Sequence, residues 1–284
     1  MLLSHLFKLE SICDVSAQTV DFTATKFRIP HQTTDPHEVI DHSKVDVVFI
    51  LTSDESHEPL ALASLKAGKH VFIEKPVTLS LPSLETILEA EKAATSISGA
   101  RVFVGYMRRY APSFLDAFKR EVATIPRILY ARIRDFSGPN TSFVNQSGTF
   151  PVRYSDYPAY ASQERNSRLD TLYAQAFHGE KITAEKQKFC RFLGSLGSHD
   201  ISLMREALGF PETVDGVSVN DPFYSAMMTF RNPDGSTYST TYESGIDEVP
   251  VFDAHIAVYG SKKRVTINVS SPLQFSSRKV LTLW

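Results

Sequence analysis

The chain has 284 residues and a net charge of −2, and 42% of its residues are hydrophobic, which excludes a disordered chain, a collagen and a coiled coil. Two cysteines are too few for a disulfide framework or a four-cysteine zinc site, and no metal is expected. Because positive charge is not in excess and no long apolar run occurs, we expect neither a nucleic-acid nor a membrane partner, but a cytoplasmic protein of about two domains.

The first hundred residues alternate the signals of short strands and helices. A strand is expected at 9–13, and Ser16 then caps a helix that runs to about Lys26. Asp35 and Pro36 are the cap and the first residue of a second helix. The alternation begins a β-α-β pattern, in which neighbouring strands run parallel.

Three further strands are expected at 46–52, 70–73 and 101–106. The first of them is a continuous apolar and β-branched run, which is typical of a strand buried on both faces of a parallel sheet. Helices begin near Ser56 and Ser80, between these strands. The pattern predicts an open parallel sheet of the α/β class, with right-handed crossovers.

The pattern changes after about residue 125. Residues 137–170 are polar and rich in Ser, Tyr and Pro, which predicts a loop, and residues 178–209 have a helical pattern. Strand-like segments follow at 213–219, 224–231, 236–243, 252–259 and 264–270. The turn at 232–235 and the absence of helical patterns between these segments predict an antiparallel sheet, so the second half is expected to be α+β.

Polar and charged side chains follow the predicted strands at the point where each strand ends. They are Asp14, Thr52, Ser53, His57, Glu74 and Lys75. Because ligands of open α/β sheets bind beyond the carboxyl ends of the strands, Lys75 is expected to point into the crevice, and Asp14 to accept from a ribose hydroxyl. The alternative is that Lys75 is a solvent-exposed charge and that His57 is an ordinary residue at a helix start.

The order of these segments, followed by residues 105–110, strongly resembles the Gfo/Idh/MocA family of glucose-fructose oxidoreductase and inositol dehydrogenase, most specifically over 45–114. The resemblance implies a Rossmann-like domain that binds NAD or NADP, which we place at 1–122. It also implies an α+β domain with a mostly antiparallel sheet, at 123–284. This second domain is expected to carry the small-molecule substrate and to form a homo-oligomer, such as a dimer, through its sheet.

The site residues follow from the same resemblance. Those that it implies for the cofactor are Asp14, Thr52, Ser53, His57, Glu74, Lys75 and Arg108. Lys75 is also implied to bind or polarise the reacting substrate, and His199 to transfer the proton, since histidine titrates near neutrality. The alternative for His199 is a helix histidine with a structural hydrogen bond. Asp14 favours NAD over NADP, because a carboxylate repels a 2′-phosphate.

Two features depart from the family pattern. The sequence contains no G-x-G-x-x-G motif, so the first strand and the Gly-rich turn that binds the pyrophosphate are expected to be missing. A chain truncated at its amino terminus, with impaired cofactor binding, is the corresponding expectation. Ser195 stands where the family has a catalytic aspartate, so a charged partner of His199 is not expected there.

Four functions remain open. The first, which we favour, is an enzyme: an NAD(P)-dependent oxidoreductase that transfers a hydride to or from a sugar-like or polyol alcohol or carbonyl substrate. The second is a non-catalytic regulatory protein that binds a dinucleotide or another ligand, which the loss of the carboxylate at Ser195 favours. The others are a cofactor-free isomerase or lyase that uses His199, and an inactive truncated product.

Overall fold

The chain folds into two compact units, which we describe separately. The computed structural model describes residues 6–139, 152–249, 251–268 and 281–283. The first unit contains Met1–Gly105 and Pro151–Cys190, and the second contains Tyr106–Phe150 and Arg191–Trp284. This division differs from the expected domain boundary after residue 122, because the chain returns to the first unit after its first pass through the second.

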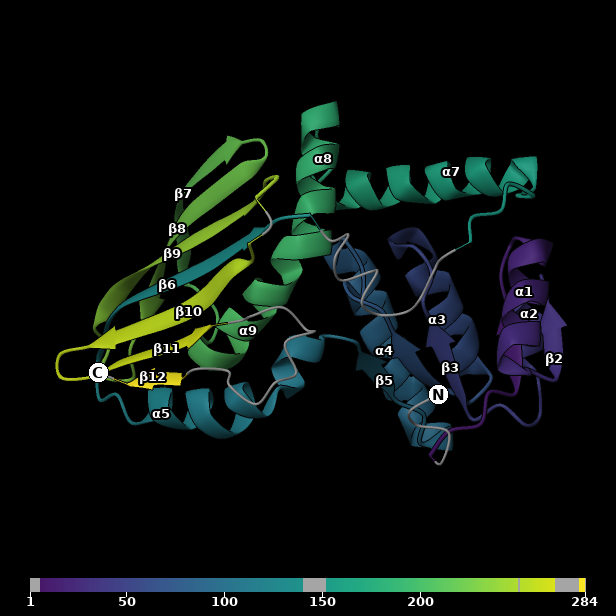
Figure 1. The fold of residues 1–284 in the computed structure, drawn as a ribbon, viewed down its shortest axis with the longest axis horizontal. Helices are drawn as coiled ribbons and strands as arrows, with labels where there is room; N and C mark the ends of the chain where they lie inside the picture. Colours follow the sequence, from purple (N-terminus) through teal and green to yellow (C-terminus); the bar gives the residue numbers. More distant parts are fainter. Residues whose placement is uncertain (1–5, 140–151, 250, 269–280, 284) are drawn as a thin grey trace. The chain divides into compact units, whose positions relative to one another are not determined.

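The first unit alternates short strands with helices, as the sequence predicted (Figure 1). Its elements are β1 (Ser11–Cys13), α1 (Ala17–Phe27), β2 (His31–Thr33), α2 (Pro36–Ile40), β3 (Val47–Ile50), η1 (Asp54–Ser56), α3 (His57–Lys66), β4 (His70–Ile73), α4 (Leu81–Ser98), β5 (Val102–Val104) and α7 (Ala159–Ala176). Among the described residues, its parallel strands form two sheets, β1-β2 and β3-β4-β5. The predicted Rossmann-like alternation of parallel strands and helices is therefore confirmed.

Helix α7 lies where the sequence predicted a loop as far as residue 170. Its buried residues Leu172 and Tyr173 lie three and four positions after the buried Leu169, so all three lie toward one face of the helix. Within the first unit, α7 contacts η1 and α4. The rest of the helix is polar, and this composition concealed a helix whose apolar face is short.

Three helices of the first unit begin at the capping residues that the sequence predicted. The capping side chains, each of which accepts a backbone N–H of the first turn, are Ser16 in α1, Asp35 in α2 and Ser80 in α4. Ser56 precedes α3 as predicted, but its side chain makes no capping hydrogen bond. The caps satisfy N–H groups that have no partner inside the helix, and so define where each helix begins.

The core of the first unit lies on one face of the sheet β3-β4-β5, against α3 and α4. The strand residues that fill it are Val48, Ile50, Val71 and Ile73. On the other face Phe49, Phe72 and Phe103 stack, with ring centroids 4.9 and 5.3 Å apart. Phe49 is 48% exposed, so the prediction that this strand is buried on both faces is wrong. Alternate residues of a strand point to opposite faces, and α3 and α4 cover one of them.

The second unit is built around one seven-stranded sheet (Figure 1). Its elements are η2 (Met107–Tyr110), η3 (Ser113–Phe118), α5 (Lys119–Ala123), β6 (Ile128–Ser137), η4 (Leu193–Gly197), α9 (Ser198–Leu208), β7 (Thr213–Asn220), β8 (Phe223–Arg231), β9 (Thr237–Ile246), β10 (Asp253–Gly260), β11 (Arg264–Asn268) and β12 (Leu281–Leu283). The strand order is β12-β11-β10-β6-β9-β8-β7, and every pair except β6-β9 is antiparallel. The predicted mostly antiparallel sheet is therefore confirmed.

Two local predictions for this part of the chain have different outcomes. The predicted turn at 232–235 joins β8 to β9, where Asn232 N donates to Ser236 O at 2.7 Å. Gly235 has φ +84°, a left-handed conformation that glycine adopts without strain. The helical pattern predicted over 178–209 is divided instead: α8 (Ala184–Phe192) contains the boundary between the units, and the π-helix η4 precedes α9.

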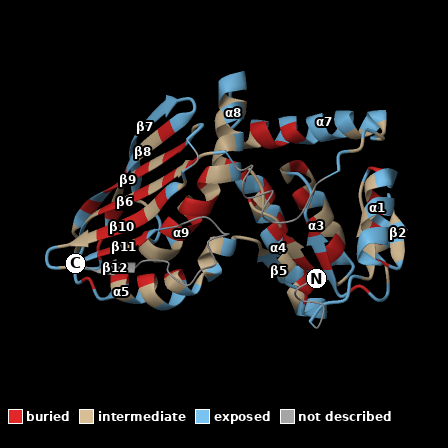
Figure 2. Ribbon diagram, viewed as in Figure 1, coloured by how far each residue is buried: buried red, intermediate tan, exposed pale blue. Residues whose placement is uncertain are grey.

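The core of the second unit lies between one face of its sheet and the helices η3, α5 and α9. Figure 2 shows buried residues alternating with intermediate or exposed ones along the strands. Phe114, Phe118 and Leu203 from the helices pack there against Ile133 and Ile256 from the strands. This packing turns the alternate residues of β6 and β9 toward the opposite face, which we call the outer sheet face.

Candidate functional site

The ends of β3 and β4 bring several predicted residues together. Glu74 N donates to Ile50 O at 3.0 Å, so the chain leaves both strands at the same edge of the sheet. Thr52 and Ser53 follow β3 and are exposed, whereas Glu74 and Lys75 follow β4 and are half-buried. The predicted grouping at the carboxyl ends of these strands is thus present in the first unit.

Two carboxyl groups, those of Glu74 and Asp54, interact with Lys75. Glu74 Oε2 accepts from Lys75 N at 3.1 Å, which turns the chain directly after the strand. Burial raises the pKa of the half-buried Asp54, while electrostatic interactions with His57 and Lys75 oppose that rise. Lys75 therefore lies within electrostatic range of Asp54, at the edge where ligands of this fold class bind.

His57 is a buried connection between the two strand ends. It is 0% exposed, its Nδ1 lies 2.8 Å from Pro76 O, and its Nε2 lies 3.1 Å from Thr52 O. The segments after β3 and after β4 are therefore held to one another through this ring. These contacts make His57 a positioning residue for Thr52 and Lys75, beside the cofactor-lining role that the resemblance implies.

We expect His57→Ala to lower the free energy of unfolding by about 3 kcal/mol, because it removes two buried hydrogen bonds and leaves a cavity. Urea unfolding measures this loss. The exposed His37 in α2 provides the matched control, and His37→Ala should change stability by less than about 0.5 kcal/mol. Unchanged stability of His57→Ala would contradict the positioning role.

Asp14 belongs to the other sheet of the first unit, at the end of β1. Its Oδ1 accepts from Ser16 N at 2.9 Å, which forms a tight turn into α1. The side chain is half-buried. Asp14 thus follows its strand as predicted, but it is not part of the β3-β4 group.

A carboxylate that sequence reasoning missed lies beside this turn. Asp156 Oδ1 accepts from Ser16 Oγ at 2.5 Å, and Asp156 Oδ2 accepts from Gln18 N at 3.0 Å. The Ser16 hydroxyl and the backbone N–H groups of Gln18 and Ala17 lower the pKa of Asp156. Nothing in the sequence signals this contact, because about 140 residues separate its partners and Asp156 lies in a polar stretch.

Arg108 joins two buried carboxyl groups of the second unit. Its Nη1 lies 2.9 Å from Asp135 Oδ2 and 2.9 Å from both carboxyl oxygens of Asp200, and its guanidinium lies 5.4 Å from the centroid of the Phe252 ring. The side chains of Asp135 and Asp200 are 0% exposed. Burial and the neighbouring Asp135 raise the pKa of Asp200, while Arg108 opposes that rise. The contacts of Arg108 are thus those of a structural ion cluster.

His199 lies next to this cluster, in the first turn of α9. It is buried, and its ring meets Tyr106 edge to face, with centroids 6.4 Å apart. Ser195 lies in the π-helix η4 and is exposed. Between them, a Cβ on Gly197 would lie 2.5 Å from Tyr242 Oη, so a larger residue here would have to displace the hydroxyl of the buried Tyr242. The segment from Ser195 to His199 is helical throughout, and the π-helix η4 forms a wider turn before His199.

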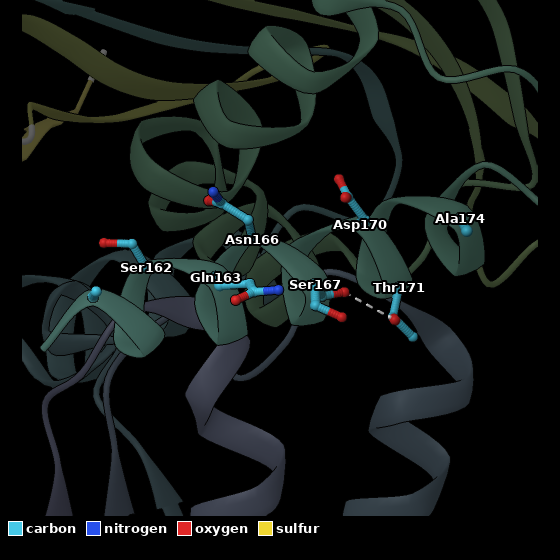
Figure 3. Close-up of a pocket in the computed structure, with 8 residues that line it drawn as sticks. Ser162, Gln163, Asn166, Ser167, Asp170, Thr171 and Ala174 are labelled. Atoms are coloured by element: carbon cyan, nitrogen blue, oxygen red, sulfur yellow. Dashed lines mark hydrogen bonds between the residues drawn. The ribbon is translucent and has the colours of Figure 1, made fainter.

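The exposed face of α7 forms a shallow hollow that contains none of the predicted residues. Figure 3 shows its polar side chains, among which Thr171 Oγ1 donates to Ser167 O at 3.1 Å. In the described part of the chain, no group of three His, Cys, Asp or Glu residues is placed to hold a metal ion. No helix among the described residues has both the length and the apolar character needed to cross a membrane.

Comparison with known proteins identifies the amino-terminal segment. Residues 2–106 match the model of the Gfo/Idh/MocA oxidoreductase family, described as an NAD-binding Rossmann fold. Over this segment the chain is similar to the Gfo/Idh/MocA family. Its relatives include a myo-inositol 2-dehydrogenase of Thermotoga maritima, 32% identical over 143 residues, and the scyllo-inositol 2-dehydrogenase (NAD(+)) of Bacillus subtilis, 31% identical over 144 residues.

These alignments cover about half of this chain, 49% and 50%, and 42% and 41% of the two relatives. Thus the chain spans about two fifths of the length of the relatives that it matches. Solved structures resemble nearly all of it. The myo-inositol 2-dehydrogenase of Lactobacillus plantarum has a TM-score of 0.64 at 20% identity, covering 92% of this chain and 68% of that one. A levoglucosan dehydrogenase in complex with NADH and levoglucosan has a TM-score of 0.64 at 17% identity, covering 97% and 70%. At these identities the likeness concerns the fold.

Proposed function

We propose that this chain is a member of the Gfo/Idh/MocA family and an NAD-dependent dehydrogenase of a polyol or sugar-like substrate. The observation that carries the proposal is the grouping of Thr52, Ser53, Glu74 and Lys75 at the carboxyl ends of β3 and β4. This group lies inside the segment that matches the NAD-binding family model. The names of the relatives, inositol dehydrogenases, support a polyol as the substrate class.

The residues present fit one part of the cofactor better than another. Asp14 at the end of β1 would accept from the adenosine ribose, and Thr52 and Ser53 would line the path toward Lys75. Arg108 is not included in this set, because its side chain is 11% exposed and is bonded to two carboxyl groups. The pyrophosphate is the part of the cofactor that the chain fits least well. The sequence contains no G-x-G-x-x-G motif, which usually supplies the backbone N–H donors for it.

The proposed chemistry assigns separate tasks to two side chains. Bound NAD would accept or donate the hydride. The ammonium of Lys75 would stabilise negative charge that develops on the substrate oxygen, and His199 would take up or return the hydroxyl proton. His57 would hold the segments of Thr52 and Lys75 in place through its two contacts.

A non-catalytic, ligand-binding protein is the second candidate, and one observation favours it. Ser195 stands in place of the aspartate of the family motif, so the charge that would stabilise protonated His199 is absent at this position. A protein that binds NAD without turnover would retain the binding group and tolerate this change.

Cofactor titration tests the binding half of the proposal. We expect the chain to bind NADH with a dissociation constant well above about 1 µM, where 1 µM corresponds to about 8.2 kcal/mol. Each missing hydrogen bond to the charged pyrophosphate costs about 1.5 to 3 kcal/mol, so two of them weaken binding by about a hundredfold or more. Calorimetry up to millimolar NADH measures this affinity. A submicromolar constant would show that other donors hold the pyrophosphate, and the absence of any binding would contradict the proposal.

We also propose that the second unit associates with another copy through the outer sheet face. On this face Arg132 Nε lies 2.6 Å from Glu243 Oε2, Arg134 Nη1 lies 3.0 Å from Asp253 Oδ2, and Tyr130 is half-buried beside them. Side chains already ordered by cross-strand ion pairs lose less freedom on association. Sedimentation velocity measures the state: a dimer supports the proposal, and a monomer at every concentration contradicts it.

A further inference from the structure

The amino terminus of α1 is occupied by a carboxylate from a distant part of the first unit. Asp156 accepts from the Ser16 hydroxyl at 2.5 Å and from Gln18 N at 3.0 Å. Ser16 Oγ in turn accepts from Thr19 N at 2.9 Å. The first backbone N–H groups of this 11-residue helix are thus committed to an anion and to the cap that this anion orients.

The segment around Asp156 is attached to α1 by more than this contact. Tyr154 lies against Phe22 of the helix, with ring centroids 6.3 Å apart, and Ser16 is 0% exposed. Hydrogen bonding lowers the pKa of Asp156, so its carboxyl stays ionised at neutral pH. The negative charge of Asp156 therefore lies at the amino terminus of α1, beside Ser16. Ser16 is two residues after Asp14 in the chain.

This location matters because of the cofactor site proposed above, on which the inference rests. In dinucleotide-binding folds, an acidic residue at the end of a strand meets the adenosine ribose, and this is the role proposed above for Asp14. NADP differs from NAD by a phosphate on that ribose. Such a phosphate needs N–H donors or cations, which a helix amino terminus usually supplies. Here Asp156 has already taken the donors of Ser16 and Gln18, and it adds a repelling charge to that of Asp14.

We propose that Asp156 is a specificity-determining residue that, together with Asp14, restricts the chain to NAD and excludes NADP. The two carboxylates act differently: Asp14 would bind the unmodified ribose, whereas Asp156 blocks the position that a 2′-phosphate would take. Removal of the charge of Asp156 alone should therefore improve the binding of the phosphorylated cofactor while that of NADH changes little.

The test compares NADH and NADPH on the full chain and on three variants, by calorimetry or ligand-observed NMR at concentrations up to millimolar. Asp156→Asn removes the charge and keeps an acceptor for Ser16, and Asp156→Ala removes both. Asp170→Asn, an exposed residue of α7, makes the same charge change elsewhere in the first unit and is the matched control. Thermal melting of each form verifies that it is folded.

We expect the ratio of the NADPH to the NADH dissociation constant to fall about tenfold in both Asp156 variants, or about 1.4 kcal/mol. In Asp170→Asn the ratio should stay within about twofold of the unsubstituted chain, less than about 0.5 kcal/mol. If NADH binds but the ratio changes no more in the Asp156 variants than in the control, the inference is overturned and the proposed function stands. If neither cofactor binds to any form, the proposed dinucleotide site is overturned, and the inference with it.

Discussion

Arg108→Met is expected to lower the free energy of unfolding by about 3 to 5 kcal/mol, the cost of removing one partner from a buried ion cluster. The guanidinium donates from one nitrogen to both Asp135 and Asp200, whose side chains are 0% exposed. Methionine replaces much of the volume of the arginine stem against Phe252 but leaves two buried carboxyl groups with no cation. Chemical denaturation monitored by circular dichroism measures the loss.

The pH dependence of this loss separates a charge effect from a packing effect. The pKa of Asp200 is raised above its ordinary value of 3.8 by burial and by Asp135, and Arg108 opposes this rise. Without Arg108 the folded-state pKa rises further, and a carboxyl that binds its proton more tightly when folded loses that stabilisation as pH rises. The difference between the two forms should therefore be smaller at pH 5 than at pH 8.

Arg120→Met is the matched control for this prediction. Arg120 has a side chain that is 70% exposed and pairs with Glu121 at 3.6 Å, so its loss should cost less than about 0.5 kcal/mol. A loss in Arg108→Met that is as small as in this control would contradict the structural role of Arg108. A large loss that does not depend on pH would assign the effect to packing.

Local signals of the sequence predicted the elements of both units well. Ser16, Asp35 and Ser80 cap helices as expected, because a cap and its target N–H lie two or three residues apart in the chain. The turn at 232–235 is equally local. Such features depend on neighbours that the sequence itself displays, so composition and spacing are sufficient to find them.

The features that sequence reasoning missed depend on contacts between distant segments. The return of 151–190 to the first unit follows from the packing of Leu169 and Tyr173, which are a minority of the residues in a polar helix. The contact between Asp156 and Ser16 joins residues that are 140 positions apart. No periodicity or motif records such a pairing.

The site shows the same division between what is local and what is distant. The placement of Thr52, Ser53 and Lys75 at one edge follows from the rule that parallel strands end together, and the structure has them there. The resemblance implies that Arg108 binds the cofactor, but its partners, Asp135 and Asp200, lie 27 and 92 residues further along the chain. A motif identifies a residue type at a position, whereas its partners depend on the tertiary fold.

Lys75→Ala is expected to lower kcat for hydride transfer by about a hundredfold or more, equivalent to about 2.7 to 4 kcal/mol of transition-state stabilisation. Under the proposed function the ammonium meets negative charge that develops on the substrate oxygen, so its removal raises the barrier more than it weakens substrate binding. Nicotinamide absorbance, followed over a panel of inositols, other polyols and sugars, measures the rate. The exposed Lys66 of α3 provides the matched control, because Lys66→Ala makes the same substitution outside the β3-β4 group.

Ser195→Asp is the complementary variant and should act in the opposite direction. A carboxylate one helical turn before His199 would favour the protonated imidazole, and thereby increase the rate of proton transfer. If Lys75→Ala leaves a measurable activity unchanged, the role of that lysine is wrong, whatever Ser195→Asp does. If NADH binds and no form turns over any substrate in the panel, Ser195→Asp included, the loss of the family aspartate does not by itself explain the inactivity. The non-catalytic binding protein then becomes the better account of this chain.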